Sequence, residues 1–167
     1  MHEVELITSG RAYAGWQDMR IVRSMDSMCG GFEFEVSELW PGQDTARRLQ
    51  PGEACTVRVD GEPVITGFVD AVEIEHAADR HSVRVAGRDK TGDLVDCSAI
   101  HKGGQWRGRT IAQIAADLCA PFGIKVSIAA DVGQALPSFA LAEGETVFEA
   151  LERLARIRAL DRKSTRL

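Results

Sequence analysis

The sequence of 167 residues lacks any close pairing of its four cysteines or its four histidines. No CxxC, CxH or HxxxH spacing occurs, and these are the spacings by which zinc sites and redox-active cysteine pairs are usually recognised. The cysteines are therefore expected to be reduced and mostly buried thiols. The sequence predicts no metal site and no cofactor.

The sequence also lacks a long apolar run and a block of basic residues. No segment approaches the roughly 18 consecutive apolar residues of a membrane span, and residues 1–10 carry acids where a signal peptide would carry bases. Acidic and basic residues are interspersed, and the formal net charge is -5. We therefore expect no membrane insertion by this chain, no sequence-specific binding of nucleic acid, and synthesis in the cytoplasm.

The sequence up to about Val85 has the pattern of antiparallel strands. Apolar and polar residues alternate most regularly in FEFEVSEL, residues 32–39, which predicts one buried and one wet face. Asp60 and Gly61 are typical of a tight hairpin turn, and Gly67 indicates a bulge or a barrel corner. About six or seven strands with short turns are expected, most simply as a tube-like antiparallel β-barrel or a sandwich.

After Gly87 the pattern becomes that of helices. Residues 110–124, TIAQIAADLCAPFGI, place apolar side chains at helical spacing, with Thr110 as the N-cap and Pro121 and Gly123 at the end. KVSIA and PSFALAEG follow as expected extended segments. Together with the strands before it, this pattern predicts the α+β class.

A second helix is expected in ETVFEALERLARIRAL, residues 145–160. Its packed side would carry Val147, Leu151, Leu154 and Ile157. No clear C-cap closes this helix, so the α+β domain is expected to be incomplete, or truncated, at its C-terminus. The terminal RKSTRL resembles translated adapter sequence, and we interpret residues 161–167 as a non-native tail.

GRDKTGDLVDCSAI, residues 87–100, brings charged residues and the Cys97 thiol into one short segment. Asp89 would serve as the N-cap of a short helix from about Lys90 to Cys97, and this capping explains the acids. A nucleophilic cysteine would need a neighbouring base or cationic pocket, for which no spacing gives support. A connector between two domains is the preferred interpretation.

Two further segments suggest chemistry and are better explained by structure. HKGGQWRGRT, residues 101–110, is basic and glycine-rich like a phosphate-binding loop, but it has neither the GxxxxGK[ST] nor the GxGxxG order. An interdomain loop anchored by Trp106 is preferred. The acids Glu143, Glu145 and Glu149 lie at a helix start, where the helix dipole favours them without any acid–base role. The sequence predicts no catalytic residues.

A β-rich unit must hide its strand edges by closing or by pairing with another chain. The long runs FEFEVSEL and PVITGFVDAVEIE are suited to sheets shared between subunits, so oligomerisation is expected. The interface candidates are Phe32, Phe34, Val36, Trp40, Val69 and Trp106.

Three stretches together resemble a known family, the baseplate hub (gpP-type tail) proteins of Mu-like contractile-tailed phages. They are YAGWQDMRIVRSMDSMCGGFEFEVSELWPGQ, then PGEACTVRVDGEPVITGFVDAVEIEHAADRHSVRVAGRDKTGDLVDCSAI, and GETVFEALERLARIRAL. The most specific part is the pattern G-x-x-x-[IV]-x-G-x-[IV]-x-x-V from Gly61 to Val72. The likeness runs from about Val4 to Leu160.

The resemblance implies a non-enzymatic role in the virion tail baseplate. Members of the family look like homotrimers in which each subunit carries two tube-like barrels, giving a pseudo-hexameric hub ring between the tail tube protein and the central spike protein. On this basis residues 1–88 are the hub barrel, 89–109 a connector and 110–160 an incomplete α+β domain. Alternatives are a spike component of a type VI secretion system or tailocin, or a tail-associated cell-wall hydrolase.

Overall fold

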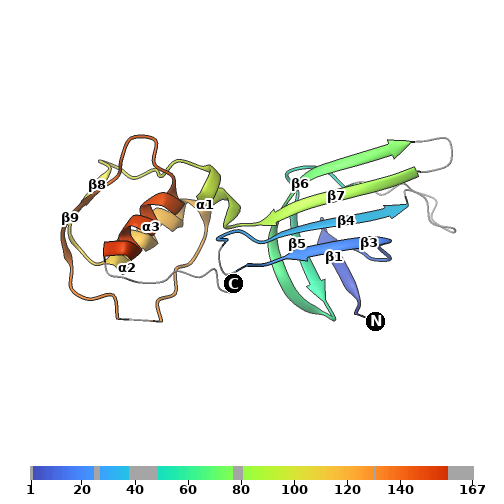
Figure 1. Ribbon diagram of the computed structural model, residues 1–167, viewed down its shortest axis with the longest axis horizontal. Coiled ribbons are helices and arrows are strands. Elements are labelled where there is room, and N and C mark those ends of the chain that lie inside the picture. Colours follow the sequence, from blue (N-terminus) through green and yellow to red (C-terminus); the bar gives the residue numbers. More distant parts are fainter. Residues whose placement is uncertain (1, 25–26, 38–48, 77–80, 130, 158–167) are drawn as a thin grey trace. The chain divides into compact units, whose positions relative to one another are not determined.

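The computed structural model describes residues 2–24, 27–37, 49–76, 81–129 and 131–157. The chain forms two compact units, one reaching to Asp89 and one beginning at Lys90. Figure 1 shows the strands of the first unit, and the helices and the two-stranded sheet β8–β9 of the second. An antiparallel sheet followed by a few helices confirms the predicted α+β class.

Seven strands in the described part of the first unit form one antiparallel sheet. They are β1 (Val4–Thr8), β2 (Arg11–Tyr13), β3 (Asp18–Val22), β4 (Gly31–Ser37), β5 (Ala54–Val59), β6 (Glu62–His76) and β7 (His81–Asp89). Their order across the sheet is β2-β1-β5-β6-β7-β4-β3, and each neighbouring pair is antiparallel.

The predicted hairpin between β5 and β6 is confirmed. Asp60 has a φ of 52° and Gly61 a φ of 82°, the two positive values that a type I′ turn requires. Ser9 and Gly10, with φ of 49° and 73°, make a turn of the same kind between β1 and β2. Both turns match the natural twist of the strands that they join.

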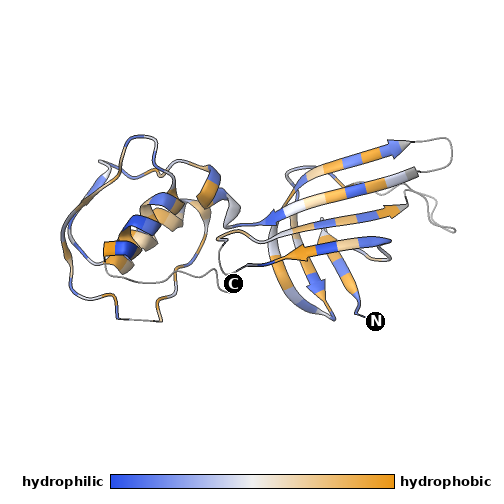
Figure 2. Ribbon diagram, viewed as in Figure 1, coloured by the Kyte–Doolittle hydropathy of each residue, from blue (hydrophilic) through white to orange (hydrophobic). Residues whose placement is uncertain are grey.

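One face of the sheet carries the core of the first unit. Figure 2 shows the alternation of apolar and polar residues along its strands. The Phe34 side chain is fully buried, and its ring stacks on Trp16 with centroids 4.8 Å apart and on Phe32 at 5.1 Å. Leu6 of β1 lies in the same cluster as these residues, although β1 and β4 are far apart in the strand order. The sheet therefore curls around a single core.

Chain connectivity also requires this curl. β2 and β3 are the two outermost strands, yet only residues 14–17 separate them in sequence. That connection spans at most about 17 Å, whereas the six gaps of about 4.8 Å in a flat seven-stranded sheet would hold its edges about 29 Å apart. The two edges must approach each other.

The expected closure into a barrel is not observed, because β2 and β3 form no ladder with each other in the described residues. Strands one and seven of an all-antiparallel sheet run in the same direction, so closure would require a parallel pair. Parallel neighbours need a crossover of about a dozen residues or more, and residues 14–17 are too few. The sheet is curled and open, which corrects the barrel prediction.

Gly67 serves a different purpose from the predicted bulge. The register between β6 and β7 shifts between Val69 and Ala71, so the bulge lies at Asp70. At Gly67 a Cβ atom would lie 1.9 Å from the Arg88 carbonyl oxygen. Glycine is required because the β7 backbone approaches too closely for a side chain.

The second unit combines three α-helices with a two-stranded antiparallel ribbon in its described residues. Its elements are α1 (Gly92–Asp96), β8 (Gln105–Arg109), α2 (Ile111–Cys119), the 3-10 turn η1 (Ala120–Phe122), β9 (Leu136–Ala140) and α3 (Val147–Ile157). The predicted N-cap of α2 is confirmed, since the Thr110 hydroxyl accepts from the Gln113 amide and the Gln113 side chain accepts from the Thr110 amide. The helix ends as expected, with Gly123 left-handed at a φ of 65°.

Several expectations for this unit are corrected. KVSIA forms no strand, and its Val126 and Ile128 side chains are exposed, because alternation predicts a face but supplies no neighbouring strand. On α3, Ala150 is buried and Ile157 is 50% exposed, so the helix turns its Ala150 side to the core. β8 lies in the segment 89–109, which was expected to be a connector. Glycines and basic residues in this segment interrupt the alternation of apolar and polar residues from which a strand is predicted.

The predicted N-cap role of Asp89 is also wrong. β7 continues through Asp89, and α1 begins only after Thr91. The Asp89 carboxylate instead accepts a hydrogen bond of 2.7 Å from the Gly30 amide, and the Asp89 amide donates to the Gly30 carbonyl at 3.0 Å. Asp89 thus secures the start of β4 against the end of β7.

Candidate interaction surfaces

The cysteines do not form a reactive site. Burial raises the pKa of the Cys29 thiol to about 11, that of Cys55 to about 12 and that of Cys119 to about 11, so all three stay protonated near neutral pH. Cys97 is exposed and follows the C-terminal end of α1. In the described ranges, no group of three or more His, Cys, Asp or Glu residues could hold a metal ion.

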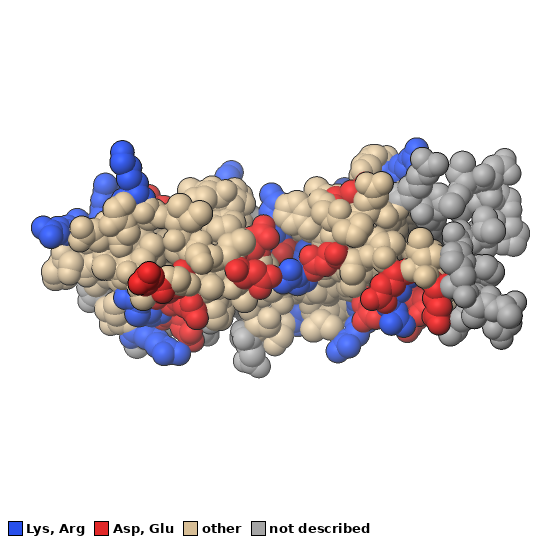
Figure 3. Space-filling view, turned by 90° about the horizontal axis from the view of Figure 1, so that it is seen from above, with Lys and Arg blue, Asp and Glu red and all other residues tan. Residues whose placement is uncertain are grey.

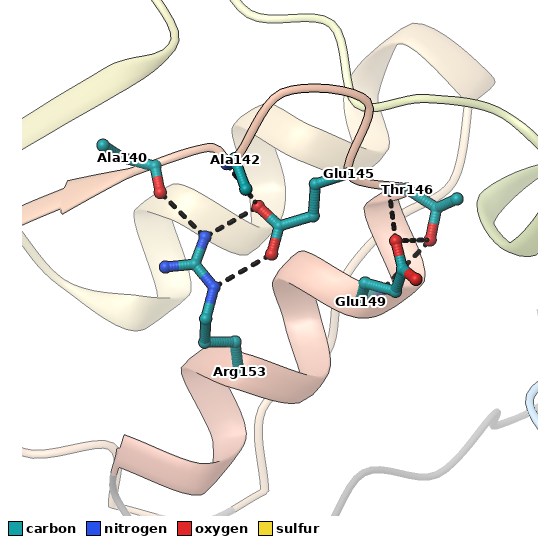
Figure 4. A network of polar contacts seen from close by, with 6 residues as sticks. All are labelled: Ala140, Ala142, Glu145, Thr146, Glu149 and Arg153. Atoms are coloured by element: carbon teal, nitrogen blue, oxygen red, sulfur yellow. Dashed lines mark hydrogen bonds and ion pairs between the residues drawn. The ribbon is translucent and has the colours of Figure 1, made fainter.

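Glu145 holds the loop between β9 and α3 through an ion pair (Figure 4). The Arg153 guanidinium donates to both Glu145 carboxylate oxygens, at 2.9 and 2.7 Å, and to the Ala140 carbonyl at 2.7 Å. The Ala142 amide donates to the same carboxylate at 2.9 Å. The hydrogen bonds from Arg153 are the main reason that the pKa of Glu145 lies below its usual range. These partners give the carboxylate a structural role.

Glu149 completes a capping box at the start of α3 (Figure 4). Its carboxylate accepts from the Thr146 amide at 2.8 Å, and the Thr146 hydroxyl accepts from the Glu149 amide at 3.2 Å. Glu143 is exposed. The three acids that suggested acid–base chemistry thus lie at a helix start as expected, but side-chain partners explain Glu145 and Glu149 more specifically than the helix dipole does.

We expect the Glu145→Gln variant to lose about 1 to 3 kcal/mol of stability near neutral pH, because one partner of a charge-assisted network on an 8% exposed carboxylate is removed. The pKa of Glu145 is lower in the folded chain, so its contribution is present above the unfolded pKa and is lost as pH falls through the folded pKa. Urea unfolding at neutral and acidic pH measures both effects. Equal losses at both pH values would contradict the assignment.

Trp106 anchors the segment 101–109, as the sequence suggested, but the segment contains strand β8 and lies within the second unit rather than forming an interdomain loop. The Trp106 ring is buried, stacks on His101 with centroids 4.1 Å apart, and lies 5.8 Å from the Phe139 ring. Its indole N–H donates to the Asp117 carboxylate on α2 at 2.9 Å. These contacts hold β8 against α2 within the second unit. They are contacts between side chains of the protein, not the backbone amide arrangement of a phosphate-binding loop.

The interface candidates of the sequence lie in the interior wherever the structure describes them. Phe32, Phe34, Val36 and Val69 belong to the core of the first unit, and Trp106 to the interior of the second. Trp40 lies outside the described residues. Side chains that fill the chain's own core are not presented to a partner, because strand alternation identifies the buried face without saying what buries it.

The strands proposed for pairing with another subunit are likewise inner strands. β4 pairs with β3 and β7 along its length, so its backbone groups are already used. β6 pairs with β5 over residues 62–68 and with β7 over residues 67–76, so it lies between two strands only where these ranges meet. The edges of the described sheet are β2 and β3. On β3, Met19 and Val22 are 45% and 44% exposed. Sequence reasoning missed this edge because strand order is not encoded in a strand's own pattern.

No helix in the described part of the chain is long and apolar enough to cross a membrane. On the face of the sheet unit that Figure 3 shows, acidic and basic side chains lie beside one another.

Two family matches cover nearly the whole chain. Residues 3–89 match the family described as Mu phage baseplate assembly protein GpP-like, N-terminal. Residues 91–162 match the family described as baseplate hub protein gp44-like, second domain. The two matches follow each other in the order of the two structural units. They confirm the resemblance noted in the sequence.

Individual relatives agree with the family matches. The chain is 42% identical over 160 residues to the baseplate hub protein gp44 of Escherichia phage Mu, covering 94% of this chain and 42% of that protein. Its fold matches the prophage MuSo2 43 kDa tail protein from Shewanella oneidensis with a TM-score of 0.87 and 39% identity, covering 95% of this chain and 51% of the other.

A tail protein from Neisseria meningitidis MC58 matches with a TM-score of 0.78 and 28% identity, over 93% of this chain and 45% of that protein. The chain thus spans about half the length of the relatives that it matches.

Proposed function

Because the chain belongs to the family of Mu phage baseplate hub proteins, we propose that it is a structural part of a contractile-tail hub that joins the tail tube to the central spike. The protein that contains it would act as a homotrimer, with the tail tube protein and the central spike protein as its partners. It would be synthesised in the host cytoplasm and reside in the virion tail baseplate. Its role there is non-enzymatic.

The observation that carries this proposal is the succession of two hub domains in one chain. The sheet unit corresponds to the first matched domain and the helical unit to the second, with the same boundary near Asp89 and Lys90. A shared fold alone would not indicate a shared role. In this chain the shared fold is accompanied by 42% sequence identity to a named hub protein. The solved structures that match are tail proteins, one of them from a named prophage, which favours a phage tail over a secretion system.

The side chains that could suggest catalysis support the same proposal. Glu145 and Glu149 serve as a loop clamp and a helix cap, and the Cys55 and Cys119 thiols are buried. The polar side chains named here are used to hold the fold of the second unit together, as expected for a structural protein.

An exchange of segments in phage Mu tests the proposal. The part of gp44 that matches this chain would be replaced by this chain, and plaque formation and tail structure would be compared with those of wild-type Mu. We expect the chimeric protein to be incorporated into contractile tails, because both units correspond to hub domains along 94% of the chain. Tails that form normally without the chimera, or soluble chimera that never enters particles, would overturn the proposal.

A further inference from the structure

The ribbon formed by β8 and β9 directs part of its backbone away from its own ladder (Figure 1). The Leu141 amide donates to the Gly104 carbonyl at 2.8 Å, so these two residues form a hydrogen-bonded pair beside the ladder. Hydrogen-bonded pairs alternate along antiparallel strands, so Trp106 and Phe139 form the next one. The backbone groups of the residues in between point to the two outer edges of the ribbon.

The two outer edges differ in what they bind. On β9, the Ala140 carbonyl points outward and accepts a hydrogen bond of 2.7 Å from the Arg153 guanidinium. On β8, Gln105 and Arg107 point their backbone groups outward, and no described strand pairs with that side. Both side chains are exposed, and a Cβ at Gly108 would meet no atom within 4 Å. The outer edge of β8 is therefore open within the second unit.

The same segment carries positive charge without a balancing acid. Residues 97–116 contain no Asp or Glu, in a chain that has 25 such residues. Lys102, Arg107 and Arg109 are exposed, and none of them forms an ion pair with a described residue. Elsewhere in the described ranges, the arginines with a carboxylate partner include Arg84, Arg88, Arg153 and Arg156. The open edge of β8 thus presents cations that no acid of this unit neutralises.

We propose that the open edge of β8 binds an extended acidic segment of a partner protein, which adds to the ribbon as a third, antiparallel strand. An added strand gains affinity from main-chain hydrogen bonds and specificity from alternate side chains. A carboxylate opposite Arg107 would accept charge-assisted hydrogen bonds from the guanidinium fork. Arg109 lies two residues further along β8 and keeps the register of the ladder, opposite Leu136. The partner is therefore expected to carry acids at alternating positions.

The charges favour this occupant over a second copy of β8. Two copies of β8 paired edge to edge would bring arginines close to one another, and like charges in a cross-strand pair are destabilising. Charged side chains on an exposed edge commonly prevent such self-pairing. The charges that repel a second β8 attract a strand of opposite sign.

The same observations disfavour a nucleic acid at this edge. Protein affinity for nucleic acid comes largely from many contacts between cations and phosphates, whereas the net charge of this chain is -5. Single strands also bind by stacking their bases on aromatic side chains. Trp106 and Phe139, the aromatic residues of the ribbon, are buried and leave no ring for a base. A peptide strand uses both the backbone edge and the arginines. This inference goes beyond the hub role and does not depend on it.

Fluorescence anisotropy of a labelled peptide, titrated with the whole chain, tests the proposal. The probe is a peptide of about eight residues, long enough for one strand, in which glutamate and threonine alternate. Arg107→Glu and Arg109→Glu each reverse one charge of the edge. Lys125→Glu makes the matched change at an exposed lysine of the same unit outside the ribbon. Thermal unfolding checks that each variant is folded.

We expect the wild-type chain to bind this peptide with a Kd below about 1 mM. Arg107→Glu and Arg109→Glu should each weaken binding about tenfold or more, and Lys125→Glu less than about twofold. Absence of binding by the wild-type chain up to about 1 mM, or a loss at Lys125→Glu as large as that at Arg107→Glu, would overturn the proposal.

Two further probes test whether the segment binds as a strand. In an antiparallel hydrogen-bonded pair, the glutamate opposite Arg107 uses its own amide N–H, whereas the neighbouring threonine amides point away. N-methylation of the glutamates should therefore weaken binding about tenfold or more, and N-methylation of the threonines less than about threefold. Equal effects, or effects in the reverse order, would refute the added strand. An oligothymidylate with the same number of negative charges should bind at least about tenfold more weakly than the peptide. Equal binding would instead identify a phosphate-binding surface and overturn the proposal.

Discussion

Replacement of Gly67 by alanine is expected to unfold the sheet unit or to cost more than about 4 kcal/mol, which is exceptional for a single methyl group. The new Cβ would lie 1.9 Å from the Arg88 carbonyl oxygen and 2.6 Å from the Asp89 Cα. Both are backbone atoms of β7, so no side chain can rotate away. Urea unfolding followed by circular dichroism measures the change.

Gly31 provides the matched control for Gly67. It lies in β4 of the same sheet, and a Cβ there would meet the Gly87 carbonyl oxygen at 3.5 Å, an ordinary contact. Gly31→Ala should therefore stay within about 1 kcal/mol of wild type. If the two alanine variants were equally stable, the close approach of β6 and β7 at Gly67 would be refuted.

The second large effect is expected at Phe34. Phe34→Ala should lower the free energy of unfolding by about 3 to 5 kcal/mol, because the ring is fully buried and its removal leaves a cavity. Stacking on Trp16 and Phe32 is lost as well. Many domains of this size are stable by only about 5 to 15 kcal/mol, so the variant should be severely weakened.

Met19 is the control for Phe34, since it lies directly opposite in the β3–β4 ladder and is 45% exposed. Met19→Ala should cost less than about 1 kcal/mol, as usual for surface changes. A loss at Met19 comparable to that at Phe34 would contradict the position of the core. Equilibrium unfolding of both variants under one set of conditions gives the comparison.

Local features of the fold could be predicted from the sequence because they depend on a few adjacent residues. The Asp60 and Gly61 turn follows from the rare freedom of those residue types to adopt positive φ. The start of α2 follows from Thr110 and Gln113, which satisfy each other's backbone amides three residues apart. Neither feature needs knowledge of a distant strand.

Features that depend on distant strands could not be predicted. The alternation of residues 32–39 showed that one face is buried, but the inner position of β4 depends on its pairing with β3 and β7. The open sheet follows from strand directions that only the complete order reveals. KVSIA has the alternation of a strand and forms none in this chain.

The central claim is that this chain is part of a trimeric hub, and the mass of the gp44 chimera in solution tests it most directly. Light scattering behind size-exclusion chromatography would be measured for the chimera and for wild-type gp44 under the same conditions. The account predicts the mass of a trimer for both proteins. A folded chimera that remains a monomer while wild-type gp44 forms trimers would contradict it.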